Sequence, residues 1–271
     1  MVSGVIAAGT VAVGVGCRLP DEVIARADPQ LVVHAVLDPA SADQLVLLEW
    51  ARTGNDGTRP AFCDQSLPTA PVADVSIGTP EGVRMTAAED TASRPLNCTS
   101  RLYRVTPGRF GVALRPGATY DLRVRTTAGG VVTGRTIIPR VVTPADSSPP
   151  EPFDRGRDTL RLAWTLTQDA ASYEVRVDRF YSSSTLFTPG PSAALSGIMR
   201  DLDNEPLFVS GTRAIVSISA VDRNYYDYYR TSSDPFTSGS QANHLTGGVG
   251  VFGALVVIAR RTLDVRGSPQ P

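Results

Sequence analysis

The chain has 271 residues, of which 20% are charged, and a formal net charge of -1. A chain of this length suits two modest domains, each with its own core. The near-neutral charge excludes a global field that would recruit nucleic acid, so no nucleic-acid partner is expected. With 24 glycines and 21 prolines the chain is rich in turns, which is typical of a protein with many β-strands.

Residues 2–16 form an uncharged run of small and apolar residues that ends at Cys17. The run is long enough for the apolar core of a secretory signal and shorter than the ~20 residues that a membrane-spanning helix needs. Small residues followed by cysteine resemble a bacterial lipoprotein signal, which is cleaved before the cysteine, whose thiol then carries a diacylglyceryl group. This resemblance implies a signal peptide at 1–16, a lipid anchor at Cys17 and a tether at 17–29. The alternative is a buried strand, or a signal with an incidental cysteine.

Cys63 and Cys98 are the two cysteines that remain if Cys17 carries a lipid, and an exported chain is expected to pair them. We predict a disulfide between them, which would stabilise the fold by about 4 kcal/mol on the chain-entropy argument. Two unrelated thiols are the alternative. A zinc site is not expected, because the chain has no C-x-x-C spacing and its two histidines, His34 and His244, stand far apart in sequence.

The first expected domain, residues 30–142, contains several short runs in which apolar and polar residues alternate. Strands are predicted at Leu31–Leu37, Gln44–Ala51 and Pro71–Gly78, and three more within Tyr103–Pro139. In that last stretch turns separate the runs, and one face of two of them is apolar: Phe110, Val112 and Leu114, then Tyr120, Leu122 and Val124. Alternation bounded by turns is typical of antiparallel strands with one face in water, so this domain is expected to be a β-sandwich.

Residues 143–158 are rich in proline and aspartate and lack periodicity, so we place a linker there. The second expected domain covers 159–266, and residues 267–271 form a tail. The apolar stretch Leu245–Ala259 of this second domain is too short for a membrane anchor and contains four glycines, which interrupt helix and strand alike. We therefore interpret this stretch as a final core strand with a glycine-lined bend.

Three motifs in the second domain resemble the fibronectin type III architecture. They are L-x-L-x-W in Leu160–Trp164, Y-x-V-x-V in Tyr173–Val177 and S-I-S-A-V-D in Ser217–Asp222. The resemblance implies a sandwich and says nothing about function. The fold class expected for the whole chain is therefore all-β, with two tandem antiparallel β-sandwich domains of the immunoglobulin or fibronectin III type.

The layout of the whole chain is similar to a family of uncharacterised bacterial surface lipoproteins that contain a domain of unknown function. The matching features are Cys17, P-V-A-D-V-S-I at Pro71–Ile77, G-A-T-Y-D-L-R-V at Gly117–Val124, Y-Y-D-Y-Y-R at Tyr225–Arg230 and G-G-V-G-V-F-G at Gly247–Gly253. The resemblance implies a transthyretin-like or carboxypeptidase-regulatory-like first sandwich. It also implies a lipid-anchored protein at the outer membrane of a Gram-negative bacterium, in the periplasm or on the surface, that assists a TonB-dependent receptor.

Sequence patterns of the common enzyme classes are absent from this chain. It contains no G-x-S-x-G, H-E-x-x-H, P-loop or dinucleotide-binding motif, so no catalytic residue and no cofactor are expected. The acidic run Asp201–Glu205 could ligate calcium, but it lacks the order of an EF-hand loop, and a solvated turn is expected instead. The expected function is a non-catalytic accessory or binding role. The alternatives are a structural or adhesive surface protein and a hydrolase with carboxylates in its loops.

A cluster of aromatic residues is the strongest candidate for a contact surface. Four tyrosines surround Asp227 directly after a predicted strand: Tyr225, Tyr226, Tyr228 and Tyr229. On a helix, Tyr225 would share one face with Tyr228 and Tyr229, whereas Tyr226 would lie beside Tyr229 and Arg230. Tyrosine combines an apolar ring with a polar hydroxyl, which suits stacking on sugars or binding a protein partner. The alternative is a short helix whose rings close the end of the sandwich.

Overall fold

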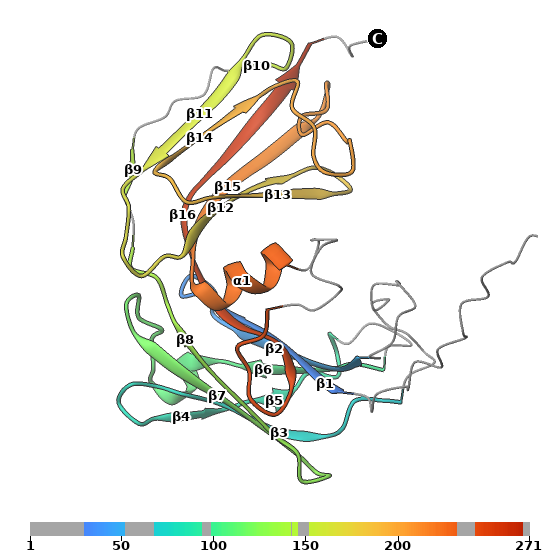
Figure 1. The fold of residues 1–271 in the computed structure, drawn as a ribbon, viewed down its shortest axis with the longest axis vertical. Helices are drawn as coiled ribbons and strands as arrows, with labels where there is room; N and C mark the ends of the chain where they lie inside the picture. The colour runs from blue at the N-terminus through green and yellow to red at the C-terminus, as the bar shows by residue number, and fades with distance from the viewer. Residues whose placement is uncertain are drawn as a thin grey trace, which may run out of the picture.

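A computed structural model describes residues 30–51, 68–93, 99–141, 143–145, 152–231 and 242–267. Within these residues the protein is mostly β, with several antiparallel sheets, one 3-10 helix and one short α-helix (Figure 1). The first elements are β1 (Gln30–Leu37), β2 (Gln44–Ala51), β3 (Ala73–Gly78), β4 (Arg84–Thr86), β5 (Ala88–Glu89), β6 (Arg101–Val105), η1 (Pro107–Phe110), β7 (Thr119–Thr126) and β8 (Val131–Ile137). They are followed by β9 (Pro144–Ala145), β10 (Phe153–Asp154), β11 (Thr159–Trp164), β12 (Ser172–Asp178), β13 (Ser183–Thr188), β14 (Ser192–Ser196), β15 (Arg213–Val221), α1 (Arg223–Thr231) and β16 (Val249–Arg266). The mostly β character predicted from the sequence is confirmed.

The first half of the molecule contains two sheets that face each other across one core. β1, β2, β6 and β5 form one sheet with the beginning of β16, and β4, β3, β7 and β8 form the other. In β7 the predicted alternation holds, because Tyr120, Leu122 and Val124 are buried while the residues between them are exposed. They belong to the same core as Val33 of β1 and Leu48 of β2, which come from the facing sheet. Alternate burial along the strands thus positions the two sheets.

The predicted strand through Phe110, Val112 and Leu114 is wrong. Pro107–Phe110 forms η1 instead, and Gly111 ends it with a backbone φ of 65°. Proline in the first turn favours a helical start, and glycine adopts the left-handed conformation that ends a helix at little cost. These two residues outweigh the short alternating pattern. Phe110 consequently lies at the surface, whereas Leu114 reaches the first core.

The second half is also built from two sheets around one core. β14, β11 and β9 form a three-stranded sheet, and β13, β12 and β15 form a sheet with the rest of β16. Leu160, Leu162 and Trp164 lie on the buried face of β11, and Tyr173 and Val175 lie on the buried face of β12. Trp164 packs against Tyr173, with ring centroids 5.2 Å apart. Residues from both sheets therefore share this second core.

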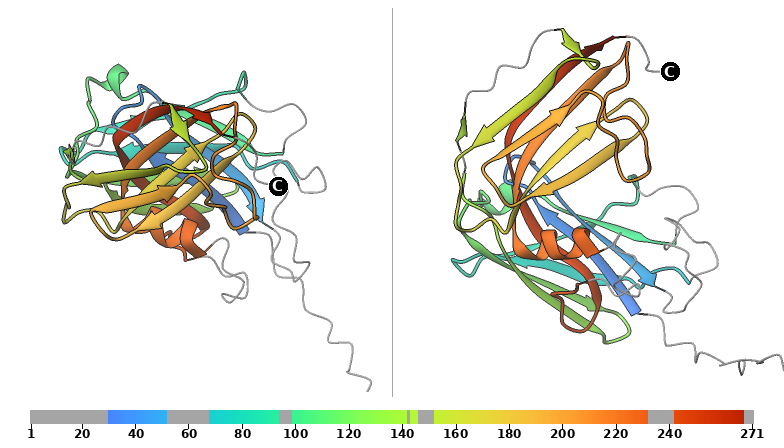
Figure 2. Two further views of the ribbon diagram at one scale, coloured as in Figure 1. Left: turned by 90° about the horizontal axis from the view of Figure 1, so that it is seen from above. Right: turned by 45° about the horizontal axis from the view of Figure 1, so that its top comes forward.

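β16 is a single strand of 18 residues that belongs to both halves (Figure 2). Its beginning pairs in parallel with β1, from Val249 opposite Val32 to Ala254 opposite Leu37. Its continuation pairs with β15 in the antiparallel direction. One nine-stranded sheet therefore runs through the molecule in the order β13-β12-β15-β16-β1-β2-β6-β5, with β10 pairing beside β16.

This shared strand differs from the expected division, which placed all of residues 159–266 in the second domain. Phe252, Ala254 and Val256 pack in the first core, although they are distant from its other members in sequence. Where the sequence predicted a glycine-lined bend, β16 pairs with β1 in continuous register. Gly250 in this stretch has a φ of 117°, and an added Cβ there would collide with the carbonyl oxygen of Val33. β16 can approach β1 this closely only because glycine has no side chain.

Candidate functional site

α1 directly follows β15 and lies between the two halves, against β16 (Figure 1). It contains the tyrosine cluster that the sequence analysis singled out. Gly253 of β16 lies next to the first turn of the helix. A Cβ at this position would be 2.9 Å from both the backbone nitrogen and the Cβ of Tyr225, closer than side-chain Cβ atoms approach other atoms. Glycine at position 253 therefore lets the helix backbone approach the strand.

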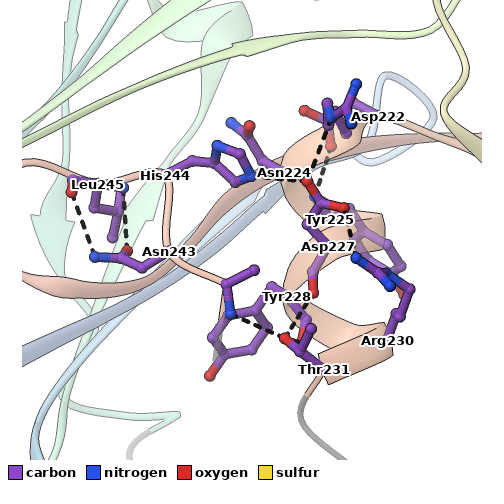
Figure 3. A network of polar contacts seen from close by, with 12 residues as sticks. Asp222, Asn224, Tyr225, Asp227, Tyr228, Arg230, Thr231, Asn243, His244 and Leu245 are labelled. Carbon is purple, nitrogen blue, oxygen red and sulfur yellow. Dashed lines mark hydrogen bonds and ion pairs between the residues drawn. The ribbon is translucent and has the colours of Figure 1, made fainter. Parts of the chain in front are cut away.

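Asp222 lies between β15 and α1 and is buried. Its Oδ1 accepts hydrogen bonds from the backbone N–H of Tyr225, at 2.9 Å, and from that of Ala254, at 3.0 Å (Figure 3). Its Oδ2 accepts a hydrogen bond from Oγ1 of Thr136 in β8, at 2.6 Å. An aspartate at this position satisfies a backbone donor that the first helical turn leaves unpaired. Burial raises the pKa of Asp222, and the three hydrogen bonds act in the opposite direction.

Asn224 attaches the first turn of α1 to the first half of the molecule. Its Nδ2 donates one hydrogen bond to the carbonyl oxygen of Phe252 in β16, at 2.8 Å, and one to that of Arg135 in β8, at 2.6 Å. Together with the contact between Asp222 and Thr136, these bonds join the helix to two strands from different sheets. The orientation of α1 is therefore fixed at its first turn.

Tyr225 faces the second half of the molecule. Its hydroxyl donates a hydrogen bond to Oε1 of Glu174 in β12, at 3.1 Å, and both side chains are buried. Thr185 of β13 donates a second, longer bond of 3.4 Å to the same oxygen. Burial raises the pKa of Glu174 and that of Tyr225, because neither charged form is well solvated there. The pair is thus a buried carboxyl held by a phenol.

Tyr228 faces the first half of the molecule. Its ring makes an edge-to-face contact with His34 of β1, with ring centroids 5.5 Å apart. His34 in turn pairs through Nε2 with Oε1 of Glu49 in β2, at 3.0 Å. Burial is the main cause that raises the pKa of Tyr228. One turn of helix therefore separates a tyrosine bound to β12 from a tyrosine packed on β1.

Tyr226 and Tyr229 form the partly exposed side of the cluster, which we call the aromatic surface of α1. Tyr226 contacts Phe187 of β13 edge to face, with ring centroids 5.4 Å apart, and the guanidinium carbon of Arg230 lies 5.3 Å from the centroid of its ring. The rings of Tyr229 and Tyr225 pack at a tilt with their centroids 4.4 Å apart, and Tyr229 is 36% exposed. The Tyr225–Tyr229 and Tyr226–Arg230 contacts follow the helical spacing expected from the sequence. Tyr225 and Tyr228, which were expected to share one face, are instead buried against opposite halves. Burial raises the pKa of Tyr229 as well.

Asp227 holds charged side chains together on the remaining side of α1. Its carboxylate lies 3.0 Å from Nε2 of His244, 3.4 Å from Nε of Arg223 and 3.6 Å from an amino nitrogen of Arg230. His244 belongs to the segment that leads into β16. Both histidines of the chain therefore contact α1, His244 through Asp227 and His34 through Tyr228.

Sequence reasoning identified the four tyrosines but missed the side chains that hold them, namely Glu174, Phe187, His34, Asn224 and Asp222. Among these, Asp222 had a local signal, because it ends a predicted strand and stands just before the aromatic run, where a helix cap is expected. The remaining contacts join residues that lie far apart in sequence. Periodicity within one strand does not indicate them.

The acidic run Asp201–Glu205 forms a turn around the carboxylate of Asp201. Its Oδ1 accepts hydrogen bonds from the backbone N–H groups of Asp203, at 3.1 Å, and Glu205, at 2.8 Å. Its Oδ2 accepts bonds from Ser184 and Arg179, and the bond from Ser184 contributes most to lowering the pKa of Asp201 to about 2. In the described part of the chain, no three His, Cys, Asp or Glu side chains are grouped so that they could hold a metal ion.

A cavity of about 640 Å³ lies at another place, at the end of the first half. Trp50, Leu31, Val132 and Asn243 line it together with Gly247 and Gly248 and five further residues, none of which is ionisable. Asn243 does not point a free amide into this space, because its Nδ2 donates to the carbonyl oxygen of Gly248 and its Oδ1 accepts from the N–H of Leu245. The lining of the cavity therefore offers no charged group that would fix a ligand's orientation.

Several predicted features lie outside the described residues. They are the signal peptide at 1–16, the lipid anchor Cys17, the tether at 17–29 and the disulfide between Cys63 and Cys98. These features stay predictions. Over the ranges that the structure does describe, no helix combines the length and apolar character needed to cross a membrane.

The fold and the contacts of α1 define a class of mostly β protein in which two halves share one strand and a short helix ties them together. The chain belongs to the family described as Domain of unknown function (DUF4249), whose profile matches residues 18–260. This range contains α1 and all the strands except the last six residues of β16. A comparison with curated proteins finds no significant match.

Several solved structures show a weak likeness to this chain. The FN1–FN3 domains of chicken CNTN1 are 15% identical with a TM-score of 0.18, over 84% of this chain and 65% of that chain. A pullulanase from Anoxybacillus sp. LM18-11 is 11% identical with a TM-score of 0.23, over 69% and 23%. Dimeric latent PorU from Porphyromonas gingivalis is 10% identical with a TM-score of 0.22, over 85% and 20%. The chain thus spans less than two thirds of each of these structures, and likenesses this weak support no functional conclusion.

Proposed function

We propose that this protein is an exported, lipid-anchored, non-catalytic accessory or binding protein that assists a TonB-dependent uptake system at the outer membrane. The aromatic surface of α1 is the observation that carries this proposal. Tyr226 and Tyr229 are partly exposed, while Tyr225 and Tyr228 beside them bury their rings against opposite halves. Rings held on a fixed helix lose little conformational freedom on binding, so this surface suits a partner protein or a ligand.

The ionisable groups around this surface support a binding role. Asp222 accepts three hydrogen bonds, Asp227 pairs with a histidine and two arginines, and Glu49 pairs with His34. Each of these groups helps to hold the helix or the strands beside it. A general acid or base must instead reach the proton of a substrate. We therefore favour binding over hydrolysis.

We also infer the finer fold and the cellular address. Three strands in the order β14-β11-β9, opposed by four in the order β13-β12-β15-β16, support a fibronectin III-like second half. The first half would then be the transthyretin-like sandwich that the family resemblance implies. Cys17 would anchor the chain in the outer membrane of a Gram-negative bacterium, and residues 17–29 would connect it to β1.

The lipid anchor is tested by producing the full chain in a Gram-negative host supplied with a radiolabelled fatty acid. We expect label on the wild type and none on the Cys17→Ser variant. Cys63→Ser is the matched control and should keep the label. If Cys17→Ser carries as much label as the wild type, the anchor is refuted. Intact mass before and after reduction and alkylation then tests the disulfide between Cys63 and Cys98.

The partner is tested by chemical crosslinking in the outer membrane followed by purification of this chain. We expect a TonB-dependent receptor among the crosslinked proteins identified by mass spectrometry, and at least about tenfold less of it with the Tyr226→Ala/Tyr229→Ala variant. Phe110→Ala is the control, because Phe110 is also 36% exposed and lies on a different element. Equal receptor recovery with both variants would show that the aromatic surface is not the contact.

A further inference from the structure

The two ends of the nine-stranded sheet differ in length and in charge. At one end β5 has two residues, and charged side chains surround it in two ion pairs, Glu89–Arg101 and Asp90–Arg104. At the other end β13 has six residues, Ser183–Thr188, and none of them is charged. Among the described residues no strand pairs with the outer side of β13. One end of the sheet is therefore short and charged, and the other is longer and neutral.

The neutral region extends beyond β13 itself. No Asp, Glu, Lys, Arg or His occurs from Phe180 to Met199, although charged residues make up 20% of the chain. β13 pairs with β12 without a register shift, from Ser183 opposite Asp178 to Thr188 opposite Tyr173. Proteins usually protect an edge strand with charges, proline or a bulge, because its free N–H and C=O groups can pair with another strand. β13 has none of these within its length.

Exposed apolar side chains lie directly beside this edge. Phe180 and Tyr181, in the turn that leads into β13, are 79% and 92% exposed, and their rings contact each other at 4.3 Å. Leu202, in the acidic turn, is 90% exposed. Exposed large apolar side chains that gather at one place mark contact sites more often than scattered ones do.

A buried ion pair joins the two turns that carry these side chains. Arg179 precedes Phe180, Asp201 precedes Leu202, and their side chains are paired at 2.9 Å with little exposure. Arg179 also donates to Oγ of Ser184 at 2.7 Å, which connects the pair to β13. The exposed side chains are therefore held near one another and near the edge strand. They and β13 together form what we call the β13 surface.

We propose that the β13 surface is a self-association site, at which a second copy of this chain adds its own β13 in the antiparallel direction. The nine-stranded sheet would continue across a two-fold axis into the second copy. Each β13 supplies the same backbone donors and acceptors, as a two-fold interface requires. Phe180 and Tyr181 of each copy would then contact the far end of the other copy's strand. This proposal does not depend on the uptake role proposed above.

The charge pattern favours a second copy over a foreign strand. When β13 pairs with a second β13 about its middle, Ser183 faces Thr188 and Thr185 faces Leu186 of the other copy. A charge near the middle of the strand would therefore lie close to its equivalent and repel it. The absence of charge from Phe180 to Met199 meets that condition. A foreign partner is usually selected by opposite charge across the contact, and β13 itself offers no charge for that purpose.

Sedimentation velocity of the purified full chain over a concentration series tests the proposal. We expect a reversible monomer–dimer equilibrium in the wild type. Thr185→Lys places a charge on an exposed side chain in the middle of β13 and should weaken dimerisation by at least about tenfold. Thr127→Lys makes the same change at an exposed threonine outside the β13 surface and should leave the dimer unchanged. Because Thr185→Lys also removes the hydrogen bond from Thr185 to Glu174, Thr185→Val, which removes that bond without adding a charge, is a control that should leave the dimer unchanged. Thermal unfolding of each variant verifies that it is folded.

A second variant separates the apolar side chains from the strand edge. Phe180→Ala/Tyr181→Ala removes the exposed rings without altering β13, and it should also weaken the dimer. A wild type that stays monomeric up to its solubility limit overturns the proposal, as does a dimer that Thr185→Lys leaves intact. If Thr185→Lys instead abolishes a complex with another protein while the chain alone is monomeric, the occupant is foreign and self-association is refuted.

Discussion

Tyr225 and Tyr228 lie one turn apart on α1 and are held in different ways. The hydroxyl of Tyr225 donates a hydrogen bond to a buried carboxyl in the second half of the molecule, whereas the ring of Tyr228 packs against the imidazole of His34 in the first half. Both rings are buried to a similar degree. The residue on the facing strand thus determines whether a tyrosine makes a hydrogen bond through its hydroxyl or a packing contact through its ring. α1 is fixed by a specific polar bond on one side and by packing on the other.

The largest effect is expected from removing the side chain of Asp222, which holds α1 in place between the two halves of the molecule. Asp222→Ala leaves the donors of Tyr225, Ala254 and Thr136 without their acceptor in a buried place, which should cost on the order of 3 kcal/mol. Urea unfolding measures the change. Asp121→Ala, at an exposed carboxylate of β7, is the control and should have a small effect.

The same variant also tests whether α1 couples the two halves. The chain has two tryptophans, Trp50 in the first half and Trp164 in the second. In a Trp50→Phe background, fluorescence follows only the second half. We expect its transition to coincide with that seen by circular dichroism in the wild type and to separate from it after Asp222→Ala. Coinciding transitions in both proteins would show that β16 alone couples the halves.

Removing the hydroxyl groups of Tyr225 and Tyr228 one at a time tests this difference directly. Tyr225→Phe deprives the Glu174 carboxyl of a donor and should cost about 1–2 kcal/mol. Tyr228→Phe keeps the ring that contacts His34 and should cost less than about 0.5 kcal/mol. Both values come from paired urea titrations at one pH. Equal losses, or a larger loss for Tyr228→Phe, would contradict the assignment of a polar and a packing side.

The contribution of the contact between Tyr225 and Glu174 to the free energy of unfolding should also depend on pH. Burial raises the pKa of Glu174 above its ordinary value of 4.5, while Tyr225, Arg176 and Thr185 around it act in the opposite direction. The stabilisation from the raised pKa is fully present below the unfolded pKa and is lost as pH rises through the folded pKa. Glu174→Gln keeps an acceptor for Tyr225 but cannot titrate. Its unfolding free energy should therefore fall less than that of the wild type between about pH 4 and about pH 8.

Asp121→Asn, which changes an exposed carboxyl on β7, is the control for this titration. Asp222 also has a raised pKa and is present in all three proteins, so its own contribution cancels in the comparison. A Glu174→Gln profile parallel to that of the wild type would mean that Glu174 does not titrate differently in the folded state.

Local patterns predicted the parts of the fold that depend on local chemistry. The alternation of β7 and the buried Trp164 and Tyr173 follow from period-two spacing, and the helical spacing of the tyrosines follows from their sequence positions. The period-two pattern wrongly predicted a strand at Phe110, where proline and glycine favour a 3-10 helix that ends at Gly111. It also failed to show that β16 completes the first core, because pairing with β1 depends on contacts between distant segments.

Glu174 shows why the site was harder to predict than the fold. In the run Tyr173–Val177 its position indicates the outer face of a strand, where a glutamate is normally solvated. It is buried because α1, which begins almost fifty residues later, contributes Tyr225 to that face. When a helix distant in sequence provides the environment of a carboxyl, the sequence of the carboxyl's own strand does not indicate that it is buried.

A further small effect, expected at Tyr226, separates a binding surface from a structural one. Tyr226→Ala removes a partly exposed ring together with its contacts to Phe187 and Arg230, and it should cost less than about 1 kcal/mol in urea unfolding. The loss should be smaller than that of Tyr225→Phe, although alanine removes the whole ring. Because a ring that contributes little to stability is free to contact a partner, this order supports the aromatic surface as a binding site. A larger loss for Tyr226→Ala would mean that its ring closes the contact between α1 and β13.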